Sequence, residues 1–164
     1  MATIAFGDST ANTVGDLPAE GTKAPSFTLV GADLAELSSA DLTGTTVLNI
    51  FPSIGTGVCQ ASVRKFNELA AGLEGTTVLN VSMDLPFALA GFCGAEGIEN
   101  VTVASGFRSS FGTDYGITLT DSKFEGLYGR AVVVVDADGT VIHSQLVPAV
   151  GQEPDYDAAI ASLG

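Results

Sequence analysis

The 164-residue sequence is poor in basic residues, contains no tryptophan and has no long hydrophobic run. Six lysines and arginines stand against 19 aspartates and glutamates, which gives a formal net charge of −13. A surface with this charge repels phosphate backbones and anionic headgroups, so we expect neither nucleic acid nor a membrane as a partner. The longest apolar run, Ala131 to Val135, is much shorter than the roughly 20 residues that a membrane-spanning helix needs.

Histidine and cysteine are also scarce. One histidine and two cysteines, far apart in the sequence, are too few for a structural zinc site, and we expect no metal and no bound cofactor. The N-terminal sequence MATIAFGDST lacks the basic start and the apolar stretch of a secretory signal, which favours a cytoplasmic location. Cysteines in that reducing compartment more often serve chemistry than structure.

What is present is typical of one folded domain spanning residues 1–164. Hydrophobic residues make up 46% of the chain and charged residues 15%, which excludes a disordered protein. No repeat, low-complexity tract or change in composition marks a second domain.

The hydrophobic pattern predicts alternating strands and helices. Thr45–Phe51 and Thr76–Met83 are β-branched and nearly continuously apolar, as in strands that are covered on both faces. Between them, apolar residues at spacings of three and four predict an amphipathic helix over 57–73. Further strands are expected at Thr3–Phe6, Phe27–Val30, Val101–Ala104, Ala131–Asp136 and Thr140–Val147, and further helices after Ser38, from Pro86 through Cys93, over Arg108–Tyr115 and from Pro154 to about Leu163. This order indicates an α/β fold with a central mixed sheet flanked by helices, of the thioredoxin-like kind.

Cys59 is the first candidate for chemistry. If Thr56 caps the helix, Cys59 lies in the first helical turn, where free amides and the positive end of the helix dipole favour the thiolate, the nucleophilic form. The alternative is an inert cysteine on the buried face of the helix, which is common for this residue type.

The sequence around Cys59 resembles a known family. Pro52, Thr56 and Cys59 match the Pro-x-x-x-Thr/Ser-x-x-Cys motif of peroxiredoxins, and FPSIGTGVCQASVRKFNELA resembles the bacterial thiol peroxidases, the atypical two-cysteine subfamily. The similarity continues in family order through FTLV (27–30), DLPFA (84–88), FCGAEG (92–97), GRAVVVVD (129–136), SQLV (144–147) and EPDYDAA (153–159).

The resemblance implies a peroxiredoxin fold with an N-terminal β-hairpin, and a role for each matching residue. Cys59 matches the peroxidatic cysteine, which attacks the peroxide and becomes a sulfenic acid, and Cys93 matches the resolving cysteine. Thr56 matches the hydroxyl that binds thiolate and peroxide, Pro52 the residue that shields the thiol, and Arg130 the arginine that stabilises negative charge. Hydroperoxide as substrate, thioredoxin as reductant and a homodimer are implied as well.

Arg130 and Cys93 each have an ordinary structural explanation. Arg130 opens a buried strand, where a guanidinium needs an anionic partner, but it could instead be exposed or paired with a carboxylate. Cys93 could be a core thiol. Its predicted helix is short and flanked by glycines, hence easily unwound, so we expect a local order–disorder switch when the two cysteines pair.

Substrate preference and alternative functions depend on other residues. Apolar residues at Phe51, Ile54, Val58, Phe87 and Phe92 favour organic or lipid hydroperoxides beside hydrogen peroxide, and Gly55 stands where many family members have aspartate. The alternative to a peroxidase is a thioredoxin-fold redox sensor or binding module without efficient turnover. A cysteine hydrolase would need His143, which the alternation of its strand predicts to face solvent.

Overall fold

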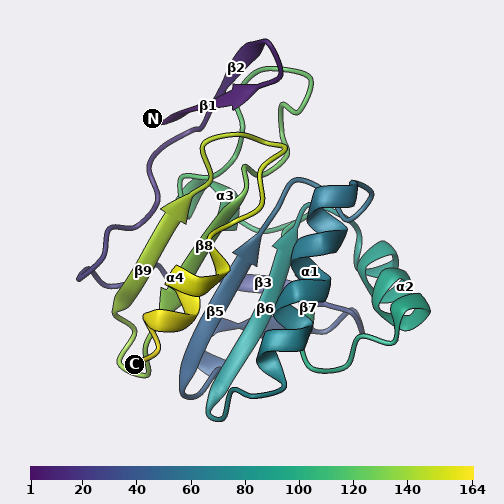
Figure 1. The fold of residues 1–164 in the computed structure, drawn as a ribbon, viewed down its shortest axis with the longest axis vertical. Helices are drawn as coiled ribbons and strands as arrows, with labels where there is room; N and C mark the ends of the chain where they lie inside the picture. Colours follow the sequence, from purple (N-terminus) through teal and green to yellow (C-terminus); the bar gives the residue numbers. More distant parts are fainter.

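The computed structural model describes all residues, 1–164, and is built on a seven-stranded mixed sheet in the order β4-β3-β7-β6-β5-β8-β9 (Figure 1). The strands are β1 (Thr3–Phe6), β2 (Ser9–Asn12), β3 (Thr28–Gly31), β4 (Glu36–Ser38), β5 (Thr45–Ile50), β6 (Thr76–Ser82), β7 (Thr102–Ser105), β8 (Ala131–Val135) and β9 (Val141–Leu146). The helices are α1 (Gly57–Ala70), α2 (Pro86–Glu96), α3 (Phe111–Asp114) and α4 (Tyr156–Ala161), with a 3-10 helix η1 (Ser39–Asp41). Strands β1 and β2 pair separately as an antiparallel hairpin, which confirms the expected N-terminal element.

The centre of the sheet consists of β5, β6 and β7, which run parallel, with β8 antiparallel to β5 on the other side. Leu48 and Leu79 lie opposite each other on one face, while Val47 and Val78 lie opposite each other on the other face. All four are buried because both faces of the sheet are covered, which explains why these strands are almost continuously apolar.

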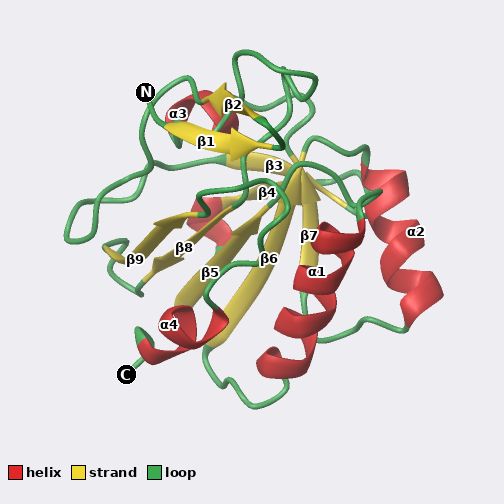
Figure 2. Cartoon of the chain, turned by 45° about the horizontal axis from the view of Figure 1, so that its top comes forward, coloured by secondary structure: helices red, strands yellow, loops and turns green.

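Helices cover both faces, as predicted, but unequally (Figure 2). Phe66 of α1 packs with Val47, Val78 and Ala159, so α1 and α4 lie on the same face of the sheet. The short α3 belongs to the opposite face, where Phe111 joins the main core cluster. Helix α2 lies beside α1, and Leu89 of α2 packs with Val63 of α1 and Val103 of β7.

Most predicted elements are confirmed, with differences at their ends. The helix expected over 57–73 ends at Ala70, and the C-terminal helix begins only at Tyr156, after Asp155 caps it. The helix predicted over Arg108–Tyr115 is wrong in extent: only Phe111–Asp114 is helical, because the Ser109 hydroxyl accepts the Phe111 N–H in a turn. No helix is long and apolar enough to cross a bilayer.

Candidate active site

Cys59 lies where the sequence predicts it, in the first turn of α1. Thr56 is the N-cap, with extended backbone angles of φ −101° and ψ 148°, and its Oγ1 accepts the Cys59 N–H at 3.4 Å. The Cys59 side chain is fully buried. The amides of the first helical turn and the helix dipole therefore act on this sulfur without competition from bulk water.

Arg130 contacts this thiol directly. Both of its terminal nitrogens donate to the Cys59 Sγ at 3.4 Å, and Nη2 also donates to the Val150 carbonyl at 2.9 Å. The side chain is only 1% exposed and makes no ion pair with a carboxylate. A buried guanidinium is costly without a negative partner, and the Cys59 sulfur is the side-chain group that its terminal nitrogens contact.

The loop between β5 and α1 holds the remaining predicted residues. Pro52 is buried two residues after the end of β5. The Thr56 hydroxyl donates to the Ser53 carbonyl at 3.3 Å, so its hydrogen points into the loop and not to the sulfur. Gly55 is exposed. The structure therefore brings Thr56 into contact with Cys59 and places Pro52 in the same loop, and the Thr56 hydroxyl must rotate to donate elsewhere.

Cys93 lies on α2 and is brought into the same apolar cluster as Cys59. The two thiols are free, and Cys93 packs against the cluster formed by Phe51, Ile54, Cys59, Val63, Leu89, Ile98 and Val103. Cys93 is half-buried, and this burial raises the pKa of its thiol above the ordinary value. Helix α2 therefore places the Cys93 sulfur against the apolar cluster that contains Cys59, but in a partly solvated environment without a charged partner.

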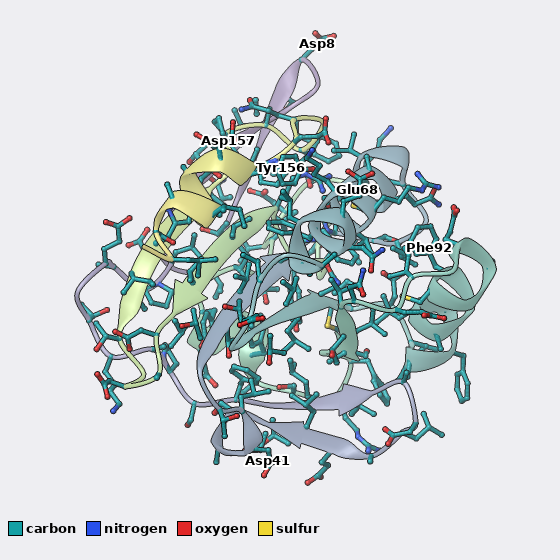
Figure 3. The ribbon with its side chains drawn as sticks, turned by 60° about the horizontal axis from the view of Figure 1, so that its bottom comes forward. Asp8, Asp41, Glu68, Phe92, Tyr156 and Asp157 are labelled. Carbon is teal, nitrogen blue, oxygen red and sulfur yellow. The ribbon has the colours of Figure 1, made fainter.

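Few interactions hold the C-terminal half of α2. Arg64 of α1 forms an ion pair with Glu96, and its guanidinium lies 5.4 Å from the ring centre of Phe92. Phe92 lies on the side of α2 that faces α1 (Figure 3). The helix ends at Gly97, which adopts a left-handed φ of 65°.

The apolar surroundings of Cys59 differ in part from the prediction. Phe51 and Ile54 belong to the cluster and Phe92 packs against it, whereas Val58 does not belong to it. Phe87 is wrongly assigned, because it is 67% exposed. It lies two residues before the buried Leu89, and a separation of two places side chains on opposite sides of a helix. Cavities of about 600 and 370 Å³ lie elsewhere, and neither is lined by a cysteine.

His143 does not form a pair with Cys59. It lies in the middle of β9, opposite Val134 of β8. Val134 is four residues after Arg130, which along an extended strand separates His143 from the Arg130 backbone by roughly 13 Å. The expectation that it faces solvent is also wrong in part, since the residue is half-buried and Nε2 is buried without a partner. No group of three or more histidine, cysteine, aspartate or glutamate side chains could hold a metal ion.

One residue near the site was not singled out from the sequence. Asp84 follows β6 and receives hydrogen bonds from Ser53 and Ile54 of the loop that precedes Cys59. The sequence offers one positional signal: the two strands are joined by a helix, as parallel neighbours are, and parallel neighbours have their carboxyl ends at the same edge of the sheet.

Comparison with known proteins agrees with this geometry. Residues 19–160 match the Redoxin family model. The thiol peroxidases of Mycobacterium tuberculosis and Corynebacterium glutamicum are both 56% identical to this chain, over 100% and 99% of it respectively and 99% of each relative.

Solved structures show the same fold. The peroxiredoxin-like protein from Aquifex aeolicus has a TM-score of 0.91 and 37% identity, covering 99% of this chain and 96% of that chain. The thiol peroxidase from Chromobacterium violaceum reaches the same TM-score and coverage at 21% identity, which supports the fold alone. With a family model that spans most of its length and full-length relatives at this identity, the chain belongs to the thiol peroxidases of the Redoxin family, peroxidase-type oxidoreductases with a thioredoxin-like fold.

Proposed function

We propose that the protein reduces hydrogen peroxide and organic or lipid hydroperoxides with Cys59 as the peroxidatic and Cys93 as the resolving cysteine. The observation that carries this proposal is the pair of hydrogen bonds from Arg130 to the buried Cys59 sulfur at a helix N-terminus. An inert core cysteine has no need of a buried guanidinium, and placing one there is costly unless the sulfur is charged.

In the first step, the Cys59 thiolate attacks the terminal oxygen of the hydroperoxide. The S–O bond forms as the O–O bond breaks, the sulfur is oxidised to a sulfenic acid, and the departing oxygen takes a proton to leave as an alcohol or water. Arg130 faces the place where negative charge moves from sulfur to oxygen, so it stabilises the transition state. The Thr56 hydroxyl, once rotated away from the Ser53 carbonyl, donates to the bound peroxide.

In the second step, the Cys93 thiol attacks the Cys59 sulfenic acid, a disulfide forms and water leaves. Each sulfur belongs to a helix in the reduced structure, so the first turn of α1 and the segment around Cys93 must unwind to let them meet. Cys93 already packs against the apolar cluster that contains Cys59, which supports this pairing. A disulfide reached by unwinding is strained relative to the folded thiols, which keeps it reducible.

In the third step, two electrons and two protons from the dithiol of a thioredoxin return both cysteines to thiols. The likeness to thiol peroxidases supports this reductant, and also supports a homodimer and a cytoplasmic location. Sedimentation velocity of the reduced and oxidised protein tests the dimer, since a monomer in both states would contradict it. Phe51, Ile54 and Phe92 around the site support turnover of apolar hydroperoxides beside hydrogen peroxide.

Peroxide treatment followed by intact mass and peptide mapping tests the assignment of the two cysteines. Wild type should lose two hydrogens and yield one peptide pair linked through Cys59 and Cys93. Cys93→Ser should accumulate a trappable sulfenic acid on Cys59, and Cys59→Ser should remain unmodified. A sulfenic acid on Cys93 in the Cys59→Ser protein would overturn the roles.

Peroxide consumption with thioredoxin and its reductase separates an enzyme from a redox sensor. We expect continuous turnover by wild type and none by Cys59→Ser. Disulfide formation without turnover, with intact thiols at the start, would show that the protein reports peroxide and does not remove it.

A further inference from the structure

We propose that Asp84 is a positioning residue that holds the Cys59 loop in its reactive shape, an inference that rests on the proposed role of Cys59. Its half-buried carboxylate accepts three hydrogen bonds. Ser53 Oγ donates to Oδ1 at 2.9 Å, while the Ile54 N–H at 2.7 Å and Ser82 Oγ at 2.6 Å donate to Oδ2. Bonds to an ionised acceptor are stronger than bonds between neutral groups, so this carboxylate fixes two consecutive loop residues.

The rest of Asp84 is anchored to the sheet. Its N–H donates to Ser82 Oγ at 3.2 Å, and its carbonyl accepts a short hydrogen bond from Ser105 Oγ. Ser82 and Ser105 are both fully buried at the carboxyl ends of β6 and β7. The carboxylate is therefore attached to the rigid edge of the sheet, and the loop is attached to the carboxylate.

From this loop, hydrogen bonds continue to the reacting sulfur. The Ser53 carbonyl accepts from both the N–H and the hydroxyl of Thr56, at 3.2 and 3.3 Å. Thr56 Oγ1 in turn accepts the Cys59 N–H. On the other side of the loop, the Ile54 carbonyl accepts from the Gln60 side chain at 3.0 Å. Asp84 thus determines where the Thr56 hydroxyl lies without touching the sulfur.

Asp84 also precedes the helix that carries Cys93. The next residue, Leu85, is the N-cap of α2 and provides no side-chain hydrogen bond to the helix. The same backbone segment therefore anchors the loop before Cys59 and the start of α2. With Asp84 in place, the Cys59 loop is ordered for attack on peroxide while the more distant part of α2 remains free to unwind.

Asp84→Asn tests this role because it keeps the size of the side chain but removes an acceptor oxygen and the charge. An amide cannot accept from Ser53, Ser82 and Ile54 together. A displacement of the reacting groups by about 1 Å costs up to 100-fold in rate, so kcat/KM for hydrogen peroxide should fall roughly tenfold or more. The value of kcat/KM for thioredoxin should remain at that of wild type, because the disulfide form has already lost the loop geometry.

The matched control is Asp121→Asn. The Asp121 carboxylate likewise accepts a backbone N–H and a side-chain N–H, both from Asn12, at 2.8 and 2.7 Å, but it lies by the N-terminal hairpin. This variant should keep both values of kcat/KM. If Asp84→Asn does not fold, Ser53→Ala removes a single bond to the carboxylate, and it should lower the peroxide value about threefold with the reductant value unchanged.

Equal losses in both half-reactions, or a peroxide value unchanged from wild type in a folded Asp84→Asn protein, would overturn the inference. Cys59→Ser in the same assay distinguishes failure of the proposed function from failure of the role of Asp84. If Cys59→Ser still consumes peroxide, the proposed function fails; if it is inactive while Asp84→Asn matches wild type, only the role of Asp84 fails.

Discussion

Cys59 and Cys93 belong to the same cluster of apolar side chains, yet their surroundings are opposite in almost every physical respect. Cys59 is fully buried, lies in the first turn of a 14-residue helix and receives two hydrogen bonds from a buried arginine. Cys93 is half-buried near the end of an 11-residue helix, and burial alone raises the pKa of its thiol. One cysteine is surrounded by groups that stabilise a negative charge, and the other is kept neutral.

The difference extends to how firmly each segment is held. The first turn of α1 is supported through Thr56, Ser53 and Asp84, and beneath it Ser62 donates to the Cys59 carbonyl. The end of α2 has one ion pair at the surface and two exposed glycines, Gly91 and Gly94, in its interior. In the proposed reaction the nucleophile must be positioned to react quickly and the resolving thiol must move, so weak local stability of α2 fits the role proposed for Cys93.

Arg130→Met should have the largest effect, because it removes the charge that distinguishes Cys59 from Cys93. Loss of a donor to developing charge costs about 100-fold to 1,000-fold, and kcat/KM for hydrogen peroxide should fall by about that factor. Stopped-flow fluorescence or competition with a reference peroxidase would measure it. Arg108→Met is the control, since this arginine is exposed and stacks only on Phe107. Equal losses in both variants would contradict the specific role of Arg130.

Stabilising α2 should have the next largest effect. An added Cβ meets no atom within 4 Å at Gly91 or at Gly94, so alanine fits both positions without strain. Replacing glycine by alanine inside a helix contributes about 0.5–1 kcal/mol per position, and the double variant should form the disulfide about tenfold more slowly. Rapid acid quench and mass analysis would follow disulfide formation after one equivalent of peroxide.

The same glycine variant should also be more easily overoxidised. A sulfenic acid that persists longer meets a second peroxide more often and becomes a sulfinic acid. Gly72→Ala, beyond the end of α1, is the control and should leave disulfide formation unchanged. If Gly91→Ala/Gly94→Ala forms the disulfide at the wild-type rate, then α2 does not need to unwind.

A smaller change in the opposite direction is expected for Arg64→Met, which loosens α2 from α1. Methionine keeps contact with Phe92 but loses the ion pair with Glu96 and the cation above the ring. Exposed pairs contribute about 0.2–1 kcal/mol, so disulfide formation should become about threefold faster. Lys65→Met breaks an ion pair within α1 alone, with Glu68 at 3.9 Å, and should not alter this rate. A slower rate in Arg64→Met would show that Arg64 helps the sulfurs to meet.

The sequence predicted the local structure around Cys59 better than that around Cys93. Its local signals are contained within a few residues: the capping Thr56 is confirmed, and the strand expected to run to Phe51 before Pro52 ends one residue earlier, at Ile50. The proximity of Arg130 to Cys59 bridges 71 residues, and it was expected only from the family resemblance and from the cost of burying a guanidinium at the start of a strand.

Side-chain direction and loop contacts were harder to predict. Apolar character alone predicts Phe87 as part of the site, but helical periodicity places it opposite Leu89 and in solvent. The contacts of Asp84 depend on two loops that meet only after β5 and β6 pair in register. Periodicity identifies which strands are buried, but it does not specify which hydrogen bonds form between the loops at their ends.

The smallest effect concerns pH and the neutral thiol of Cys93. Burial raises the pKa of Cys93 in folded α2 above its ordinary value of 9.0, which it regains when α2 unwinds. Below pH 9 both forms are protonated and the stability contribution is constant. Above pH 9 the unwound form loses a proton more readily than the folded form, so the stability of α2 falls as pH rises.

Thermal unfolding of the reduced protein would detect this loss. Wild type and Cys93→Ser contain the same titrating groups apart from the Cys93 thiol. The difference between their free energies of unfolding should therefore be constant from pH 7 to about 8.5. Above pH 9 it should shift against wild type, since only wild type carries the titrating thiol. A difference that stays flat to pH 10.5 would mean that Cys93 is as exposed in folded α2 as in the unfolded chain, and that burial does not keep its thiol neutral.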